Sequence, residues 1–156
     1  MNNKKRLLII SHAPSVNTKE MLSAVIRGAS NSSLDGVDII SLAPLEACPA
    51  DIIAADAIIL GATENLGYMA GLVKDLFDRC YYPCLDHTQG KPFAYYIRAG
   101  FDGTGTQRGI ESIITGLRWR VVQAPLICKG EFHDDFIAQC EELGLYIAAS
   151  LESGII

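Results

Sequence analysis

The chain has 156 residues and a mass of 16.9 kDa, with 49% hydrophobic residues, 20% charged residues and a formal net charge of −5. This length fits one globular domain over residues 1–156, and the apolar content excludes intrinsic disorder. The acidic balance argues against nucleic acid as a partner. No uncharged apolar run approaches the roughly 18 residues of a membrane-spanning helix, so we expect no membrane partner either.

The start of the chain does not fit a secretory signal. A basic segment, residues 1–6, is followed by an apolar run that stops at Ser11, short of the roughly 7–15 apolar residues that such a signal needs. The five cysteines form an odd set without a C-x-x-C pair, which predicts buried free thiols rather than disulfides. Both features favour a cytoplasmic protein.

Apolar runs of strand length alternate along the chain with segments of helical period. The expected strands are residues 7–11, 37–42, 57–61, 93–99 and 121–128. They lack strict alternation, which is typical of strands buried on both faces. Helical periodicity spans residues 21–29, 69–80, 110–117 and 136–147, with a weaker segment at 45–55. The pattern predicts an α/β fold, a parallel sheet with helices on both faces.

In such sheets, ligands bind outside the carboxyl ends of the strands, where the strand order reverses. For five strands in the order 2-1-3-4-5, the loops after strands 1, 3 and 4 line that place. The first loop, residues 11–18, carries hydroxyl and amide side chains and leads into a helix, whose free N–H groups favour a phosphate. The alternative for this loop is an ordinary helix cap at Asn17 or Thr18, with Glu20 nearby.

The second and third loops are rich in glycine. Residues 61–71 contain three glycines, which let the backbone approach a flat ligand, although the same segment also fits a turn and a helix start. The third loop sets three glycines beside Phe101. Its Gly103-Thr104-Gly105 is not a dinucleotide fingerprint, because Arg108 stands where the last glycine belongs and the motif should follow the first strand.

Two blocks of the chain resemble the NAD(P)H-dependent FMN reductases and related flavodoxin-like quinone reductases. The stretch that begins at Ala55, ADAIILGATENLGYMAG, resembles their ADAIIFGSPTYFGNMSG pattern, and KPFAYYIRAGFDGTG at residues 91–105 is similar to their strand and flavin loop. The first loop looks like their phosphate loop. The resemblance implies a flavodoxin-like three-layer fold with the strand order 2-1-3-4-5.

The resemblance also implies an FMN site built from all three loops. The phosphate would be held by Ser11, Ser15, Val16, Asn17 and Thr18. The edge of the isoalloxazine ring would follow Ala62, Thr63, Glu64, Asn65, Leu66, Gly67 and Tyr68. The other side would be closed by Ala99, Gly100, Phe101 and Gly105.

The second loop departs from the family pattern. Ala62-Thr63 replaces Ser-Pro, Glu64-Asn65-Leu66 replaces Thr-Tyr-Phe, and Tyr68 replaces Asn. The lost aromatic pair leaves Tyr68 or Phe101 to supply a stacking ring.

The implied activity is hydride transfer from NAD(P)H, through bound FMN, to a quinone, free flavin or similar small-molecule electron acceptor. Backbone N–H groups near residues 100–105 would stabilise negative charge on the ring. The resemblance also implies a possible homodimer. Two alternatives stay open: a flavodoxin-type electron carrier without nicotinamide turnover, and a binding module of the same fold that has lost flavin.

Two further classes of site are rejected. A phosphoacceptor receiver domain would need an acidic pair after the first strand, where the chain has Ser11-His12. A zinc site at Cys80 and Cys84 lacks a second pair of ligands.

Overall fold

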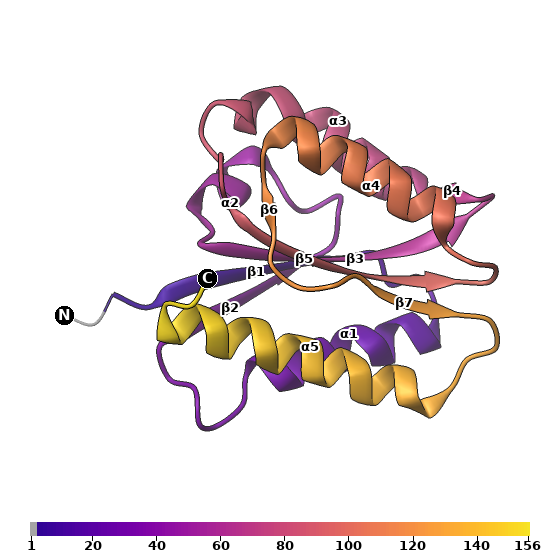
Figure 1. Cartoon of the computed structure of the whole chain (residues 1–156), viewed down its shortest axis with the longest axis horizontal. Coiled ribbons are helices and arrows are strands. Elements are labelled where there is room, and N and C mark those ends of the chain that lie inside the picture. Colours follow the sequence, from indigo (N-terminus) through magenta and orange to yellow (C-terminus); the bar gives the residue numbers. More distant parts are fainter. Residues whose placement is uncertain (1–2) are drawn as a thin grey trace.

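A parallel sheet forms the centre of the molecule (Figure 1). The structure is a computed structural model that describes residues 3–156. Its elements are β1 (Lys5–Ser11), α1 (Val16–Ala29), β2 (Val37–Leu42), α2 (Pro49–Ala54), β3 (Ala57–Asn65), β4 (Tyr68–Met69), α3 (Gly71–Leu85), β5 (Pro92–Ala99), α4 (Thr104–Leu117), β6 (Arg120–Val121), β7 (Leu126–Lys129) and α5 (Asp134–Ser153). The strand order β2-β1-β3-β5-β6 confirms the predicted order of the sheet.

The last strand of the sheet differs from the prediction. The expected continuous strand over residues 121–128 is instead two short strands, β6 and β7, which pair with the two ends of β5. Pro125 lies between them, and a proline cannot donate a backbone hydrogen bond to a neighbouring strand. The prediction of one strand was therefore wrong at its centre, although both pieces run parallel to β5 as expected.

The helices form two layers around the sheet. Helices α1 and α5 cover one face, and α2, α3 and α4 cover the other (Figure 1). Strand β1 shows why both faces are filled: Leu8 and Ile10 join the core beneath α2 and α3, whereas Leu7 and Ile9 join the core beneath α1 and α5. All four side chains are at most 1% exposed. Burying each one contributes roughly 1.5–3 kcal/mol to the stability of the fold.

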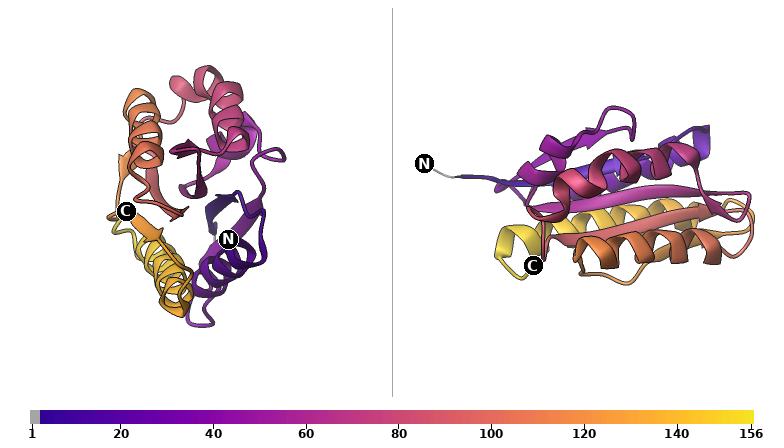
Figure 2. Two further views of the ribbon diagram at one scale, coloured as in Figure 1. Left: turned by 90° about the vertical axis from the view of Figure 1, so that its right-hand side faces the viewer. Right: turned by 90° about the horizontal axis from the view of Figure 1, so that it is seen from above.

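The parallel arrangement brings the predicted loops to one edge of the sheet. The carboxyl ends of β1, β3 and β5 all lie at the right-hand side of Figure 1, and this edge faces the viewer in the left panel of Figure 2. Among the helices of residues 3–156, none has the length and apolar character needed to cross a membrane. Four cysteines are buried free thiols, whereas Cys48 is exposed.

Candidate functional site

The first loop ends in a helix cap that uses two of the predicted hydroxyl groups. Ser15 is the N-cap of α1, and its Oγ accepts the backbone N–H of Thr18 at 3.2 Å. Thr18 Oγ1 in turn accepts the backbone N–H of Ser15 at 2.9 Å, which completes a capping box. The cap therefore lies at Ser15, and the alternative that placed it at Asn17 or Thr18 was wrong by two or three residues.

The start of α1 leaves backbone donors available. In the part of the chain that the structure describes, no acceptor pairs with the N–H groups of Val16 and Asn17. Both residues are exposed, Val16 by 72%. His12 precedes them in the loop, and burial lowers the pKa of its imidazole, which favours the neutral form. The helix dipole and the two amides are thus the electropositive features of this loop.

Ser11 is turned into the molecule rather than toward the loop. It is 4% exposed, and its Oγ lies 2.8 Å from the hydroxyl oxygen of Tyr96. Gly61 on the neighbouring strand makes this contact possible, because a side chain there would overlap both of these groups. Burial raises the pKa of the Tyr96 phenol above its ordinary value, so this hydroxyl stays protonated. The pair stabilises the end of β1 from beneath the loop.

The second loop is a β-hairpin instead of an open loop. Strand β3 continues beyond its predicted end to Asn65, and β4 returns antiparallel to it. The turn has positive φ at both central residues, 53° at Leu66 and 74° at Gly67, as in a two-residue type I′ turn. Met69 therefore belongs to β4, and α3 begins only at Gly71.

The hairpin lies directly against the start of α4. A side chain at Gly105 would overlap the carbonyl group of Gly67, and one at Gly109 would meet the ring of Tyr68. These two glycines therefore let the hairpin approach the helix. The predicted second and third loops meet at this contact, which leaves Leu66 fully exposed and Tyr68 40% exposed.

Glu64 joins the second loop to the third. Its two carboxylate oxygens accept the backbone N–H groups of Phe101 and Gly103, each at 2.8 Å. These amides belong to the segment that was predicted to stabilise charge on a ligand. Gly103 adopts a positive φ of 72°, a conformation that suits glycine and turns its N–H toward the carboxylate.

The third loop is also anchored by Arg98, at the end of β5. The guanidinium group of Arg98 donates to the carbonyl groups of Ala99, Cys128 and Gly130 at 2.7, 3.0 and 2.7 Å. Phe101, in the same loop, is 82% exposed. The hydroxyl of Thr106, in the first turn of α4, is buried and has no hydrogen-bond partner among residues 3–156. The third loop and the start of α4 thus combine an anchor at Arg98, the exposed ring of Phe101 and the unsatisfied hydroxyl of Thr106.

Solved structures resemble this arrangement over almost the whole chain. A flavodoxin from the domain Archaea matches 94% of this chain and 99% of its own, with a TM-score of 0.76 and 22% sequence identity. A WrbA-like flavodoxin from Agrobacterium tumefaciens matches 97% of this chain and 99% of its own, with a TM-score of 0.75 and 16% identity. The chain has the flavodoxin-like fold.

The sequence comparisons are more distant. A flavodoxin from Aquifex aeolicus is 29% identical over 112 residues, which is 72% of this chain but only 60% of that protein's length. No protein-family model matches the chain. The flavodoxin-like fold therefore rests on the shape of the molecule.

The two halves of the predicted site differ in how well they fit FMN. The start of α1 fits a phosphate group, because the amides of Val16 and Asn17, both exposed residues, lie at the positive end of a helix. The amides of Phe101 and Gly103 in the third loop are not available to the edge of a flavin ring, because both donate to Glu64. The hairpin and α4 also touch each other, through Gly67 and Gly105. The phosphate end is open, and the ring end is closed by the protein itself.

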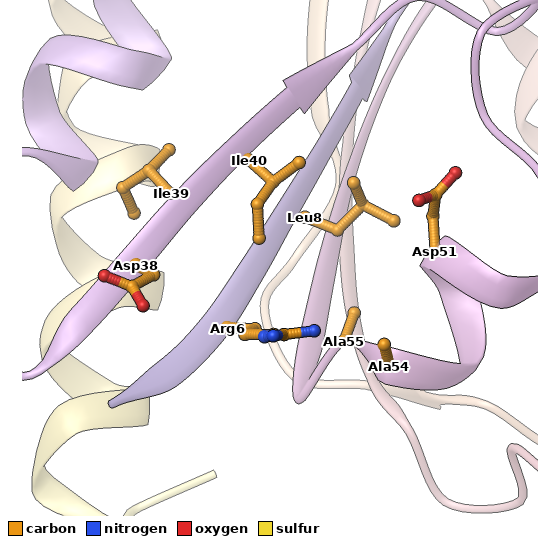
Figure 3. A pocket seen from close by; sticks show the side chains of 8 residues that line it. All are labelled: Arg6, Leu8, Asp38, Ile39, Ile40, Asp51, Ala54 and Ala55. Carbon is orange, nitrogen blue, oxygen red and sulfur yellow. The ribbon is translucent and has the colours of Figure 1, made fainter. Parts of the chain in front are cut away.

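A separate cavity lies away from this edge, beside α2 (Figure 3). It has a volume of about 480 Å³ and is lined by Arg6, Leu8, Asp38, Ile39, Ile40, Asp51, Ala54 and Ala55. In Figure 3 the Arg6 side chain extends toward Ala54 and Ala55 at the end of α2. Helix α2 is only six residues long, which leaves this part of β1 and β2 incompletely covered. None of the lining residues comes from the three loops.

The sequence did not indicate three of the contacts that shape the site. They are the pairing of Ser11 with Tyr96, the anchoring of the third loop by Arg98, and the acceptor role of Glu64. An arginine inside an otherwise apolar strand was a usable signal for the second contact. The other two join residues far apart in the chain and leave no local pattern.

Proposed function

We propose that the protein binds FMN at the carboxyl edge of its sheet and transfers electrons through it. The observation that carries this proposal is the start of α1, where the amides of the exposed residues Val16 and Asn17 follow the first strand of a flavodoxin-like fold. A phosphate group accepts hydrogen bonds from such amides without a cationic side chain. The relatives named flavodoxin support the same choice of ligand.

The chain also supplies apolar surface for a flat ring. Leu66, Tyr68 and Phe101 are exposed side chains of the second and third loops, at the same edge as the start of α1. Aromatic rings stack on flat ligands with a modest gain beyond the area they bury. Of the remaining residues of the proposed site, residues 62–65 pair with β5 and β4, and the Phe101 and Gly103 amides of residues 99–105 are held by Glu64.

Bound FMN would supply the redox chemistry, accepting hydride from NAD(P)H and passing electrons to a small acceptor such as a quinone or free flavin. The protein's part is to hold the cofactor and leave one face accessible. The short two-residue turn at Leu66 and Gly67 favours an accessible face, because no aromatic side chain lies between Glu64 and Gly67. We further propose cytoplasmic action and a homodimer.

A second candidate function is a flavodoxin-type electron carrier. The names of the relatives favour it, since the Aquifex protein and the archaeal structure are both described as flavodoxins. The two functions separate under anaerobic conditions, where the flavin absorbance of the loaded protein is followed after NADPH or NADH is added. Bleaching supports the reductase, and an unchanged spectrum supports the carrier.

The phosphate site is tested by Val16→Pro. Proline is favourable at the first residue of a helix, and Ser15 before it already has the extended backbone that precedes proline (φ −124°, ψ 166°). The variant therefore removes one amide donor while α1 is retained. A charge-assisted hydrogen bond contributes roughly 1.5–3 kcal/mol, so FMN affinity should fall at least about tenfold.

Riboflavin, which lacks the phosphate, is the matched ligand for this test. Its affinity, measured by flavin fluorescence, should be the same for Val16→Pro and the unmodified protein. Urea unfolding of both proteins checks that α1 is intact. If Val16→Pro lowered the affinity for FMN and for riboflavin equally, or lowered neither, the phosphate would not bind at the start of α1.

A further inference from the structure

The Glu64 carboxylate saturates two donors at the ring end of the candidate site. Both of its oxygens are used, one by the N–H of Phe101 and one by the N–H of Gly103. The two amides are separated by a single residue, so they present neighbouring donors to one bidentate acceptor. This is the arrangement by which a loop holds an anion or the electron-rich edge of a heterocycle.

The Glu64 carboxylate is held in place by its hydrogen bonds to these two amides. Glu64 forms no ion pair with a lysine or arginine within residues 3–156. The neighbouring side chains of the hairpin are also occupied elsewhere, because the hydroxyl of Thr63 donates to the side-chain oxygen of Asn65. Glu64 is half-buried, so water can take over its hydrogen bonds when it leaves the amides.

A ring edge and Glu64 compete for the same donors. A backbone N–H makes one strong hydrogen bond at a time, and a carboxylate is a stronger acceptor than a neutral carbonyl or ring nitrogen. The competition favours the closed arrangement until another part of the ligand contributes binding energy. The start of α1 offers that second contact to a ligand that carries a phosphate.

We propose that Glu64 is an internal ligand of the third-loop amides, and that a flavin ring reaches those amides only when the carboxylate swings out. This inference rests on the proposed binding of FMN. Glu64 thereby lowers the affinity of the site for both flavins, and the phosphate contact at the start of α1 gives FMN the additional binding energy that offsets displacement of the carboxylate. The residue acts by occupying the site and takes no part in the redox step.

The inference is tested by titrating FMN and riboflavin into the full chain and its Glu64→Gln and Glu64→Ala variants. Glutamine keeps one acceptor oxygen and places an NH₂ group against the second amide, whereas alanine frees both amides. Affinity for both flavins should rise in the order unmodified, Glu64→Gln, Glu64→Ala, by at least about tenfold overall. Glu111→Gln is the matched control, since Glu111 accepts a hydrogen bond from Tyr95 and does not touch the third-loop amides.

Riboflavin separates displacement from charge repulsion. Removing a negative charge favours the FMN phosphate alone, whereas freeing the amides favours both flavins. An increase confined to FMN, or an equal increase in Glu111→Gln, would overturn the inference. A loss of affinity in Glu64→Ala would overturn it too, because it would mean that Glu64 builds the site instead of closing it.

Amide hydrogen exchange, followed by NMR, provides a readout that does not depend on redox activity. Without flavin, the Phe101 and Gly103 amides should be protected in the unmodified protein and exchange faster in Glu64→Ala. In Glu64→Ala, FMN should protect these two amides from exchange again. If the amides exchanged as fast with FMN as without it, the inference would be refuted. If FMN binds to none of these proteins, the proposed function itself fails. If FMN binds with the same affinity to the unmodified protein and to both Glu64 variants, only the inference about Glu64 fails.

Discussion

Leu66 occupies a backbone conformation that leucine rarely adopts. Its φ of 53° lies in the left-handed region, which costs an L-residue with a bulky side chain roughly 1–2 kcal/mol. Nothing is gained by burial, because the side chain is fully exposed. A type I′ turn with this geometry prefers Asn-Gly. The hairpin that carries Glu64 is thus formed at a cost in backbone energy.

Leu66→Asn should therefore stabilise the protein. We expect the free energy of unfolding, measured with urea, to rise by up to about 1 kcal/mol, since asparagine adopts the left-handed region at a smaller cost. Leu45→Asn is the control, because Leu45 is also exposed but has no positive φ, and its replacement should change stability by less than about 0.5 kcal/mol. A loss of stability in Leu66→Asn would show that the leucine makes a contact in solution.

Glu64 illustrates what a sequence leaves hidden at this scale. Its departure from the family pattern was visible, and it directed attention to a lost aromatic pair. The acceptor role was not visible, because it depends on Phe101, 37 residues away, and on the backbone direction at Gly103. Residue types predict what a side chain is able to do, whereas its partner is set by how two loops meet.

Helices α1 and α5 pack closely against each other. A side chain at Gly144 would overlap the carbonyl group of Val25, and one at Gly28 would overlap the carbonyl group of Glu141. Each glycine thus admits the backbone of the other helix. The exposed side of this contact carries an ion pair between Arg27 and Glu141 at 3.1 Å, which adds little because both side chains are half-exposed.

Gly144→Ala should force the two helices apart. Overpacking of this kind costs about 1–3 kcal/mol, so the urea midpoint should fall clearly below that of the unmodified protein. Gly71→Ala is the matched control, because a side chain there meets no atom within 4 Å and should cause no loss. If Gly144→Ala were as stable as Gly71→Ala, the close approach of the helices would be disproved.

The positions of the strands were correctly predicted from the sequence, whereas two local features of the sheet were not. The strands were predictable because runs such as residues 7–11 and 93–99 are mainly apolar on both faces, which is typical of a covered parallel sheet. The hairpin was not predictable, because Leu66-Gly67 lacks the Asn-Gly signal of its turn. The break between β6 and β7 was signalled by Pro125 and was missed because the apolar run continues on both sides of it.

For the whole molecule, the three loops of the candidate site were placed correctly at one edge because topology alone determines it. Once β1, β3 and β5 are parallel neighbours, the segments that follow them must lie together. Which loop amides are free is a different kind of property. It depends on side chains such as Ser15 and Glu64, each of which satisfies donors in its own part of the edge.

The buried ionisable groups of the core predict how stability depends on pH. Burial raises the pKa of the Cys80 thiol from 9.0 to about 11 and also raises the pKa of the Tyr95 and Tyr96 phenols. Above pH 9 the unfolded chain releases these protons while the folded protein retains them. The unfolded state then binds fewer of these protons, so these three groups lower the stability as pH rises.

Urea unfolding at pH 7, 9 and 10.5 should therefore show a midpoint that is steady up to about pH 9 and falls above it. Cys80→Ala should reduce the steepness of that fall, because one of the retained protons is gone, whatever the variant's stability at neutral pH. Cys48→Ala is the control, since Cys48 is exposed and loses little hydration on folding. A midpoint that stayed constant to pH 10.5 would mean that the core admits the charged forms, and the two packed layers would then be less closed than the burial of β1 and β5 implies.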